Sequence, residues 1–301
     1  MTLSTSQLSV DGIRVRYRRT GTARSSGQTV LLVHGFTRSL DDWEELHARG
    51  SGFDLISLDL PGFGESQPFD GPVSIGRYAQ FLSAFLDELG VADFHLVGSS
   101  LGGAIAMMLT VQHPDRVQSL LLADSAGFGR SVTPGLRVLD LKPVGNLVLS
   151  VPRLHASVAV HGLFHDRRHA TRERIDANMR YASVPHYREL IYELGASLGN
   201  LFGVRRGWRT DLVSRLARLD VPITIVWGAK DRVLPARHLR HAARLLPRAA
   251  TILLPRVGHL PQIEAAARFA EIASELWNAS GRGNDGPHPR ARGAASPSNI
   301  S

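Results

Sequence analysis

Short apolar runs recur along the first part of the chain and predict the strands of a sheet. Thr29–Val33, Asp54–Leu58 and Val117–Ala123 are apolar on both sides, and a fourth run begins at Phe94 and stops at Gly98. Strands of this kind, when helices separate them, form parallel sheets that are covered on both faces. The pattern therefore predicts an α/β fold with a mostly parallel central sheet and helices on both of its faces.

Local signals predict the elements around these strands. Residues 8–17 alternate in polarity around an Asp-Gly pair, which is typical of a tight hairpin turn. Residues 74–89 carry apolar positions at helical spacing, with a serine that can cap the start and Gly90 to end the helix. Leu101–Gln112 has no internal proline and is interpreted as a buried helix.

After Asp124 the alternation of strands and helices stops. The next convincing strand lies at residues 221–227, nearly a hundred residues later, whereas ordinary connections are about two to six residues long. The segment between them contains helical stretches, for example at residues 172–182 and 186–198. We expect residues 128–215 to form an inserted helical cap over the carboxyl ends of the strands.

The sheet resumes after the cap and completes one core. The remaining predicted elements are a helix, a strand and a last helix, at residues 236–246, 251–254 and 264–277. We expect residues 1–127 and 216–278 to form the two parts of this core. Residues 279–301 are rich in Gly, Pro, Ser and Arg without apolar spacing, so we predict a disordered tail there.

The composition of the 301 residues, 43% apolar and 21% charged, is that of a globular protein that can bury a sizeable core. No run reaches the ~18 apolar residues that a membrane helix needs, and the start lacks the basic-then-apolar order of a signal peptide. We therefore expect a cytoplasmic protein with no transmembrane segment. The absence of cysteine excludes disulfides, thiolate metal sites and thiol catalysis.

The formal charge of +8 raises the question of a nucleic-acid partner. Of the 35 basic residues only two are lysine, and the arginines are spread along the chain without interleaved aromatic residues. Nothing resembles a DNA- or RNA-binding module. We expect a small-molecule substrate and no nucleic-acid partner, and the sequence leaves the oligomeric state open.

The candidate chemistry centres on a Gly-x-Ser-x-Gly pattern, in which Gly98 and Gly102 frame Ser100 between a predicted strand and a predicted helix. In a nucleophile elbow the serine occupies a strained strand-to-helix turn that tolerates little bulk on either side. The pattern alone is equally typical of a plain tight turn. The strand before it and the helix after it favour Ser100 as a nucleophile.

A serine hydroxyl needs an adjacent base, and the base needs an orienting acid. Among 13 histidines, His259 stands out because it lies in a short loop directly after a predicted strand. Asp231 follows the strand at residues 221–227, and the order Ser100, Asp231, His259 is that of a hydrolase triad. Asp124 also closes a strand near the elbow and is the rival acid.

The oxyanion of such a reaction needs backbone N–H donors, usually one after the nucleophile and one from an earlier loop. Leu101 supplies the first and Phe36, after His34 and Gly35, is the natural second. For the His34 side chain we favour hydrogen bonds to nearby backbone.

Three cap histidines recur every four residues, at His161, His165 and His169. Imidazoles at this spacing can bind a metal, but their neighbours are mainly arginines and no supporting carboxylate pattern is evident. We interpret them as a solvated face of the cap and expect no metal and no cofactor.

Several motifs together resemble the α/β-hydrolase superfamily, over about residues 8–277. They are His34-Gly35-Phe36, the segment DLPGFGES at 59–66, the elbow at 98–103, WGAKD at 227–231 and GHLPQ at 258–262. The resemblance implies the α/β-hydrolase fold with a serine nucleophile. Members with an aspartate at the elbow, such as haloalkane dehalogenases and epoxide hydrolases, are disfavoured because Ser100 stands there.

Within that superfamily we expect a serine hydrolase, a carboxylesterase, that cleaves an ester or related acyl compound with a hydrophobic part. One alternative is a carbon–carbon hydrolase of aromatic ring-fission products, for which the resemblance implies a cap arginine such as Arg180 holding a substrate carboxylate. That class usually has a glycine-rich segment after His-Gly and a tryptophan after the catalytic histidine, whereas residues 37–39 and Leu260 differ. A second alternative is a ligand receptor that kept the pocket without turnover.

Overall fold

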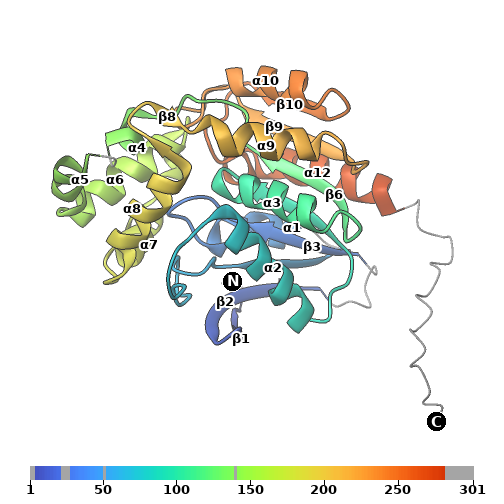
Figure 1. Ribbon diagram of the computed structural model, residues 1–301, viewed down its shortest axis with the longest axis horizontal. Coiled ribbons are helices and arrows are strands. Elements are labelled where there is room, and N and C mark those ends of the chain that lie inside the picture. The colour runs from blue at the N-terminus through green and yellow to red at the C-terminus, as the bar shows by residue number, and fades with distance from the viewer. Residues whose placement is uncertain (1–3, 22–27, 50–51, 139–140, 282–301) are drawn as a thin grey trace, which may run out of the picture.

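The structure is a computed structural model and describes residues 4–21, 28–49, 52–138 and 141–281. Within these ranges an eight-stranded sheet forms the centre of the molecule, in the order β1-β2-β4-β3-β5-β6-β9-β10 (Figure 1). The strands are β1 (Ser6–Val10), β2 (Ile13–Thr20), β3 (Thr29–Val33), β4 (Asp54–Leu58), β5 (Phe94–Ser99), β6 (Val117–Ala123), β9 (Ile223–Gly228) and β10 (Ala250–Leu254).

The direction of the strands divides the sheet into two parts. β1, β2 and β4 pair antiparallel, whereas β4, β3, β5, β6, β9 and β10 pair in parallel. The β1-β2 hairpin turns at Asp11 and Gly12, which have φ angles of 50° and 77°. Two positive φ values are what a two-residue hairpin turn requires, and Asp and Gly tolerate them. The mostly parallel sheet and this hairpin agree with the sequence prediction.

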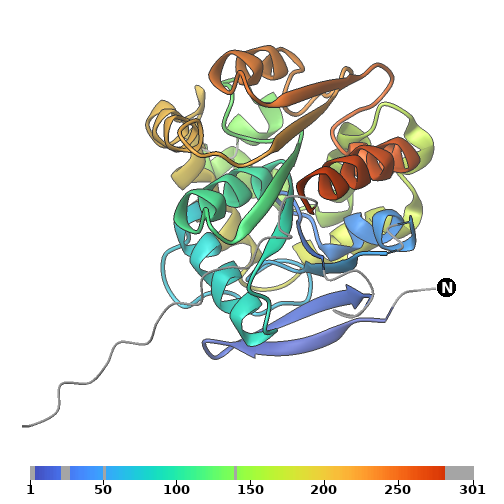
Figure 2. The same cartoon turned by 90° about the vertical axis from the view of Figure 1, so that its right-hand side faces the viewer.

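Helices cover both faces of the sheet (Figure 2). On one face lie α1 (Glu44–Arg49) and α12 (Ala266–Gly281), and on the other lie α2 (Ile75–Glu88), α3 (Leu101–Gln112), α9 (Arg206–Leu216) and α10 (Arg237–Leu245). Alternate residues of β3 serve the two faces, because Val30 packs in one hydrophobic cluster and Leu31 in the other. Each buried strand therefore contributes to two cores, which explains its unbroken apolar run.

Most of the helices between β6 and β9 gather beyond one end of the sheet, on the left in Figure 1. They are α4 (Pro134–Val138), α5 (Lys142–Leu149), α6 (Pro152–Leu163), α7 (Arg172–Ala182) and α8 (Tyr187–Leu198), followed by the short hairpin of β7 (Gly199–Asn200) and β8 (Gly203–Val204). α9, inside the predicted cap of residues 128–215, contacts α3 of the core layer. The division into cap and core remains a proposal, and the predicted tail at 279–301 lies almost wholly outside the described residues.

Helix α2 begins where the capping signal placed it. The Ser74 hydroxyl accepts a hydrogen bond from the Arg77 N–H at 3.1 Å, and Gly90 follows the helix with a φ of 68°. The last predicted helix, at residues 264–277, corresponds to α12, and a separate short helix, α11 (Pro261–Glu264), precedes it. In the described part of the chain, no helix has the length and apolar character needed to cross a membrane.

Candidate active site

Ser100 occupies a sharp turn between β5 and α3. Its φ of 55° lies in the left-handed region, and its N–H donates to the Ala123 carbonyl at 2.9 Å. A Cβ at Gly98 would collide with the Gly102 carbonyl, and a Cβ at Gly102 would collide with the Val33 carbonyl. The close approach of strand, turn and helix therefore requires both glycines of the motif.

Three side chains from the carboxyl ends of three strands form one hydrogen-bonded chain. The Oγ of Ser100 lies 2.9 Å from Nε2 of His259, and Nδ1 of His259 lies 2.8 Å from Oδ2 of Asp231. His259 is 2% exposed and Asp231 is 8% exposed, so water has little access to the hydrogen bond between these two side chains. The structure thus brings together the three side chains that the sequence singled out.

Asp231 receives hydrogen bonds on both carboxylate oxygens. Its Oδ1 accepts from the N–H groups of Val233 at 2.7 Å and Leu234 at 3.0 Å, while Oδ2 faces the imidazole. Hydrogen bonds from N–H groups stabilise negative charge on a carboxylate. The loop after β9 therefore orients Asp231 and supports its charge.

Helix α6 contacts the loop that carries His259. The His259 N–H donates to the carbonyl of Leu163, the last residue of α6, at 2.7 Å. The preceding Gly258 N–H donates to Oε2 of Glu264 at 2.5 Å. The position of the imidazole is therefore set partly by α6 and partly by α11.

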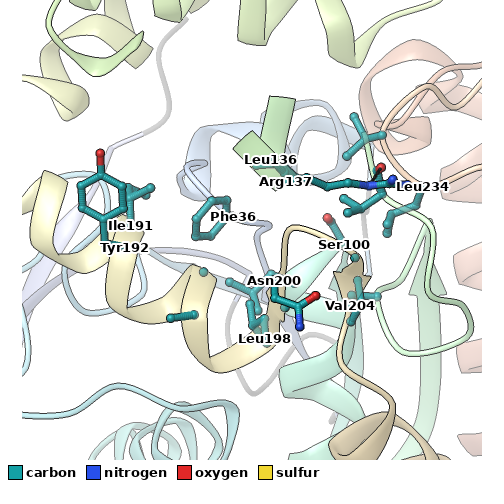
Figure 3. A pocket seen from close by; sticks show the side chains of 18 of the residues that line it. Phe36, Ser100, Leu136, Arg137, Ile191, Tyr192, Leu198, Asn200, Val204 and Leu234 are labelled. Carbon is teal, nitrogen blue, oxygen red and sulfur yellow. Dashed lines mark hydrogen bonds between the residues drawn. The ribbon is translucent and has the colours of Figure 1, made fainter. Parts of the chain in front are cut away.

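Phe36, Ser100 and Leu101 line the same cavity. Figure 3 shows the first two of these side chains. A Cβ at Gly35 would approach the Ser100 Cβ to 3.1 Å, which shows how closely the loop after β3 packs on the elbow. The loop after β3 and the start of α3 thus bring Phe36 and Leu101 to the cavity at Ser100, and the role of their N–H groups as oxyanion donors remains a proposal.

His34 bonds to the backbone, as the sequence analysis favoured. Its Nδ1 bonds to the Gly35 carbonyl at 2.8 Å, and its Nε2 accepts from the Leu60 N–H at 2.9 Å. Complete burial lowers the pKa of His34. A neutral ring with the proton on Nδ1 satisfies both bonds, so His34 ties the loop after β3 to the loop after β4.

A second carboxyl group lies beside the triad. Asp124, the rival acid, is fully buried at the end of β6, and its Oδ1 accepts from the Gly228 N–H at 3.0 Å. One oxygen of Asp124, one oxygen of Asp231 and one ring nitrogen of His259 lie within 4.8 Å of one another. Burial and the neighbouring Asp231 raise the pKa of Asp124 well above its usual range. The acid that hydrogen-bonds to His259 is Asp231.

The cavity at Ser100 has a volume of about 150 Å³ and a mostly apolar wall. Figure 3 shows Phe36, Ile191 and Tyr192 on one side of Ser100, and Arg137 and Leu234 on the other. The sequence alone did not indicate a role for Arg137, because it is one of many arginines and no motif surrounds it. Only the fold shows that it lines the cavity. The apolar lining comprises Phe36, Leu101, Ala126, Val132, Leu136, Ile191, Ala196, Leu198, Val204, Trp208, Val233 and Leu234.

The three cap histidines do not form one helical stripe. His161 lies on α6, whereas His169 lies on a separate 3-10 helix, Arg167–His169. Among the described residues, the one group of His, Asp and Glu whose ligand atoms converge is that of Asp124, Asp231 and His259. The hydrogen bonds given above account for the geometry of that group.

A mostly parallel sheet covered on both faces, with serine, histidine and aspartate meeting at its carboxyl edge, is the architecture of the α/β hydrolases. Comparison with known families agrees, since the alpha/beta hydrolase fold family matches residues 28–266. The chain belongs to this family.

Several known proteins are similar to the chain. The dihydrolipoyllysine-residue acetyltransferase component of the acetoin cleaving system of Cupriavidus necator is 34% identical over 262 residues, which are 86% of this chain but only 65% of that protein. A 2-hydroxy-6-oxononadienedioate/2-hydroxy-6-oxononatrienedioate hydrolase of Pseudomonas is 26% identical, covering 83% of this chain and 88% of that protein. The crystal structure of a membrane phospholipase A superposes with a TM-score of 0.76 at 26% identity, over 92% of this chain and 86% of that one.

Proposed function

We propose that the protein is a serine hydrolase that cleaves a carboxylic ester or a related acyl compound through an acyl-enzyme. The observation that carries the proposal is the hydrogen-bonded chain from Ser100 through His259 to Asp231, which ends at the wall of an apolar cavity. A hydroxyl that can pass its proton to an oriented imidazole is an activated nucleophile.

In the first half-reaction the Oγ of Ser100 attacks the substrate carbonyl carbon while Nε2 of His259 takes the hydroxyl proton. The N–H groups of Phe36 and Leu101 stabilise the resulting oxyanion, and each such donor is worth about 3 kcal/mol in the transition state. Collapse of the intermediate breaks the acyl C–O bond, and His259 gives its proton to the leaving alcohol. Asp231 stabilises the imidazolium that forms in between.

In the second half-reaction water replaces the alcohol. His259 removes a proton from the water, the hydroxide attacks the acyl carbon, and Ser100 leaves with the proton that His259 returns. The products are a carboxylic acid and free enzyme. The apolar walls formed by Phe36, Ile191 and Leu198 favour a substrate with a hydrophobic acyl or aromatic part.

Hydrolysis of short aryl esters by the purified protein and by Ser100→Ala tests this proposal. The kcat/KM of the variant should fall at least 10³-fold, because a triad without its nucleophile retains little catalysis. Ser99→Ala is the matched control, since Ser99 is the neighbouring serine, is fully buried and pairs with Gln262 Nε2 at 3.3 Å. Hydrolysis by Ser100→Ala at the rate of the parent would overturn the proposal.

A second candidate is hydrolysis of a carbon–carbon bond in a ring-fission product, the chemistry named for the Pseudomonas relative. One observation favours it: Arg137 lines the cavity beside Ser100, with Nε bonded to the Val132 carbonyl at 3.0 Å, and could hold a substrate carboxylate. Arg180, the cap arginine that the resemblance suggested for this role, is exposed on α7 and is not among the residues that line the cavity.

A ring-fission dienoate and an aryl ester, assayed in parallel, separate the two candidates. Under the carbon–carbon hypothesis the parent turns over the dienoate faster, and Arg137→Met raises the KM for the dienoate at least tenfold while Arg180→Met does not. Efficient ester cleavage with no turnover of the dienoate rejects the second candidate and supports the first.

A further inference from the structure

Asp124 and Asp231 form a close pair of buried carboxyl groups. Asp124 is completely buried and Asp231 is 8% exposed, and one oxygen of each lies within 4.8 Å of the other. Two carboxylates this close in a buried site do not both keep a full negative charge, because like charges repel strongly where solvent screening is weak. One of the two therefore carries a proton.

More hydrogen-bond donors face Asp231 than face Asp124. Asp231 accepts from the N–H groups of Val233 and Leu234 and from the His259 ring. Asp124 accepts at Oδ1 from the Gly228 N–H, whereas no N–H or O–H group among the described residues donates to its buried Oδ2. Three donors stabilise the anion far better than one, so the negative charge stays on Asp231 and the proton on Asp124.

Asp124 also connects β6 to the turn that carries Asp231. The Gly228 N–H donates to Asp124, and the Gly228 carbonyl accepts from the Asp231 N–H at 3.2 Å. The Asp124 carboxyl group and the Asp231 backbone N–H thus both bond to Gly228, the first at its N–H and the second at its carbonyl. Loss of the acceptor at position 124 would free this N–H and loosen the base of the turn.

We propose that Asp124 is a positioning residue of the triad that acts as an uncharged carboxylic acid: it fixes the turn of Asp231 and leaves Asp231 as the only anion bonded to His259. The titratable groups that face Asp124 are Asp231 on the loop after β9, and His259 and Glu264 on the loop after β10 and on α11. The inference rests on the proposed function, because it assigns a role within that triad.

Asp124→Asn and Asp124→Ala test the two parts of the role. Asp124 has a φ of 44°, and Asn shares with Asp an unusual tolerance of that left-handed conformation, so the Asn variant fits the backbone. The side-chain oxygen of the Asn can still accept from the Gly228 N–H, and the amide carries no charge.

We expect the kcat/KM of the Asn variant to lie within about threefold of that of the parent. The Ala variant should lose about 10²-fold in kcat with little change in KM, since misplacement by about 1 Å costs that much.

The plot of kcat/KM against pH gives a second test. A merely structural role of Asp124 would not move its acid limb, which is the fall in activity on the low-pH side. If Asp124 is uncharged, Asp124→Asn leaves the acid limb in place. If Asp124 is an anion, its removal makes the protonated imidazole less favourable, and the acid limb moves to lower pH. Such a movement in the Asn variant overturns the proposal.

Infrared difference spectroscopy of the full-length protein decides the charge without reference to activity. The parent minus Asp124→Asn spectrum should show the carbonyl stretch of a protonated carboxylic acid, which absorbs apart from carboxylate bands. Carboxylate bands in its place overturn the proposal. Asp54→Asn is the matched control, because Asp54 is also buried but pairs with Arg19 at 2.7 Å, at the amino end of β4.

The Asp54→Asn protein should be less stable, with an unchanged pH profile and no carboxylic-acid band in its difference spectrum. The two proposals can fail separately. If the parent cleaves no ester, the proposed function fails, while the infrared difference still reports whether Asp124 is protonated.

Discussion

The Nδ1 atom of His259 and the Oδ2 atom of Asp231 lie 2.8 Å apart, joined by a hydrogen bond that is largely closed to water. This bond fixes the proton of the neutral ring on Nδ1, so that Nε2 is free to accept the proton of Ser100. The proposed mechanism depends on that choice of tautomer.

Asp231→Asn tests the role of this bond. An amide NH₂ in place of the Oδ2 atom favours the wrong imidazole tautomer and removes the charge that stabilises the imidazolium. We expect kcat to fall by about 10⁴-fold on an aryl ester while KM changes little, measured with saturating substrate. A loss of less than tenfold would show that Asp231 does not orient the base.

Gly98→Ala tests the steric requirement of the elbow. The added methyl group would collide with the Gly102 carbonyl, so the free energy of unfolding should fall by about 3 kcal/mol and activity should be lost. Gly207→Ala is the control, because a Cβ at that exposed position on α9 meets no atom within 4 Å. Urea titration should show the control unchanged or up to about 1 kcal/mol more stable. Equal stability of the two variants would contradict the account of the elbow.

Three buried histidines predict how stability depends on pH. Burial lowers the pKa of His47 to about 3, of His95 to about 4 and of His238 to about 4. Each of these histidines binds a proton near pH 6.5 in the unfolded chain but only at a lower pH in the folded protein. The folded state is therefore most stable above pH 6.5, and it loses stability as the pH falls toward 4.

Between these limits the free energy of unfolding should fall on the order of 1 kcal/mol per pH unit for each histidine. Urea titrations at a series of pH values measure this slope. His47→Gln should lower the slope, since a neutral amide can still reach the hydroxyls of Thr20 and Ser57 that His47 contacts at 2.7 and 2.8 Å. A free energy of unfolding that does not change between pH 7 and 5 would contradict the prediction.

Much of the core could be predicted because its strands are buried on both faces. Thr29–Val33, Asp54–Leu58 and Val117–Ala123 appear in the structure with the predicted bounds, since a continuous apolar run leaves little choice of element. Leu101–Gln112 is likewise found as predicted. The short α4 and the β7-β8 hairpin were not predicted, because they are fixed by tertiary contacts and carry no periodic pattern.

The candidate site was predictable where its residues follow strands. The carboxyl ends of parallel strands share one edge, so Ser100, Asp231 and His259 could be expected to meet there. The place of Arg137 could not be expected in this way, because it reaches the cavity from α4, a five-residue helix of the predicted cap. From the sequence, Asp124 could be predicted only as an alternative to Asp231 as the acid. That the two lie close together depends on the pairing of β6 with β9, which no local sequence pattern specifies.

Labelling of the active serine tests the central claim most directly. The purified protein is treated with a fluorophosphonate probe, digested and mapped by mass spectrometry, beside Ser100→Ala and Ser99→Ala. The account predicts one adduct, on Ser100, that is kept in Ser99→Ala and lost in Ser100→Ala. An unlabelled parent, as expected of an inert receptor, or a label on another residue would contradict it.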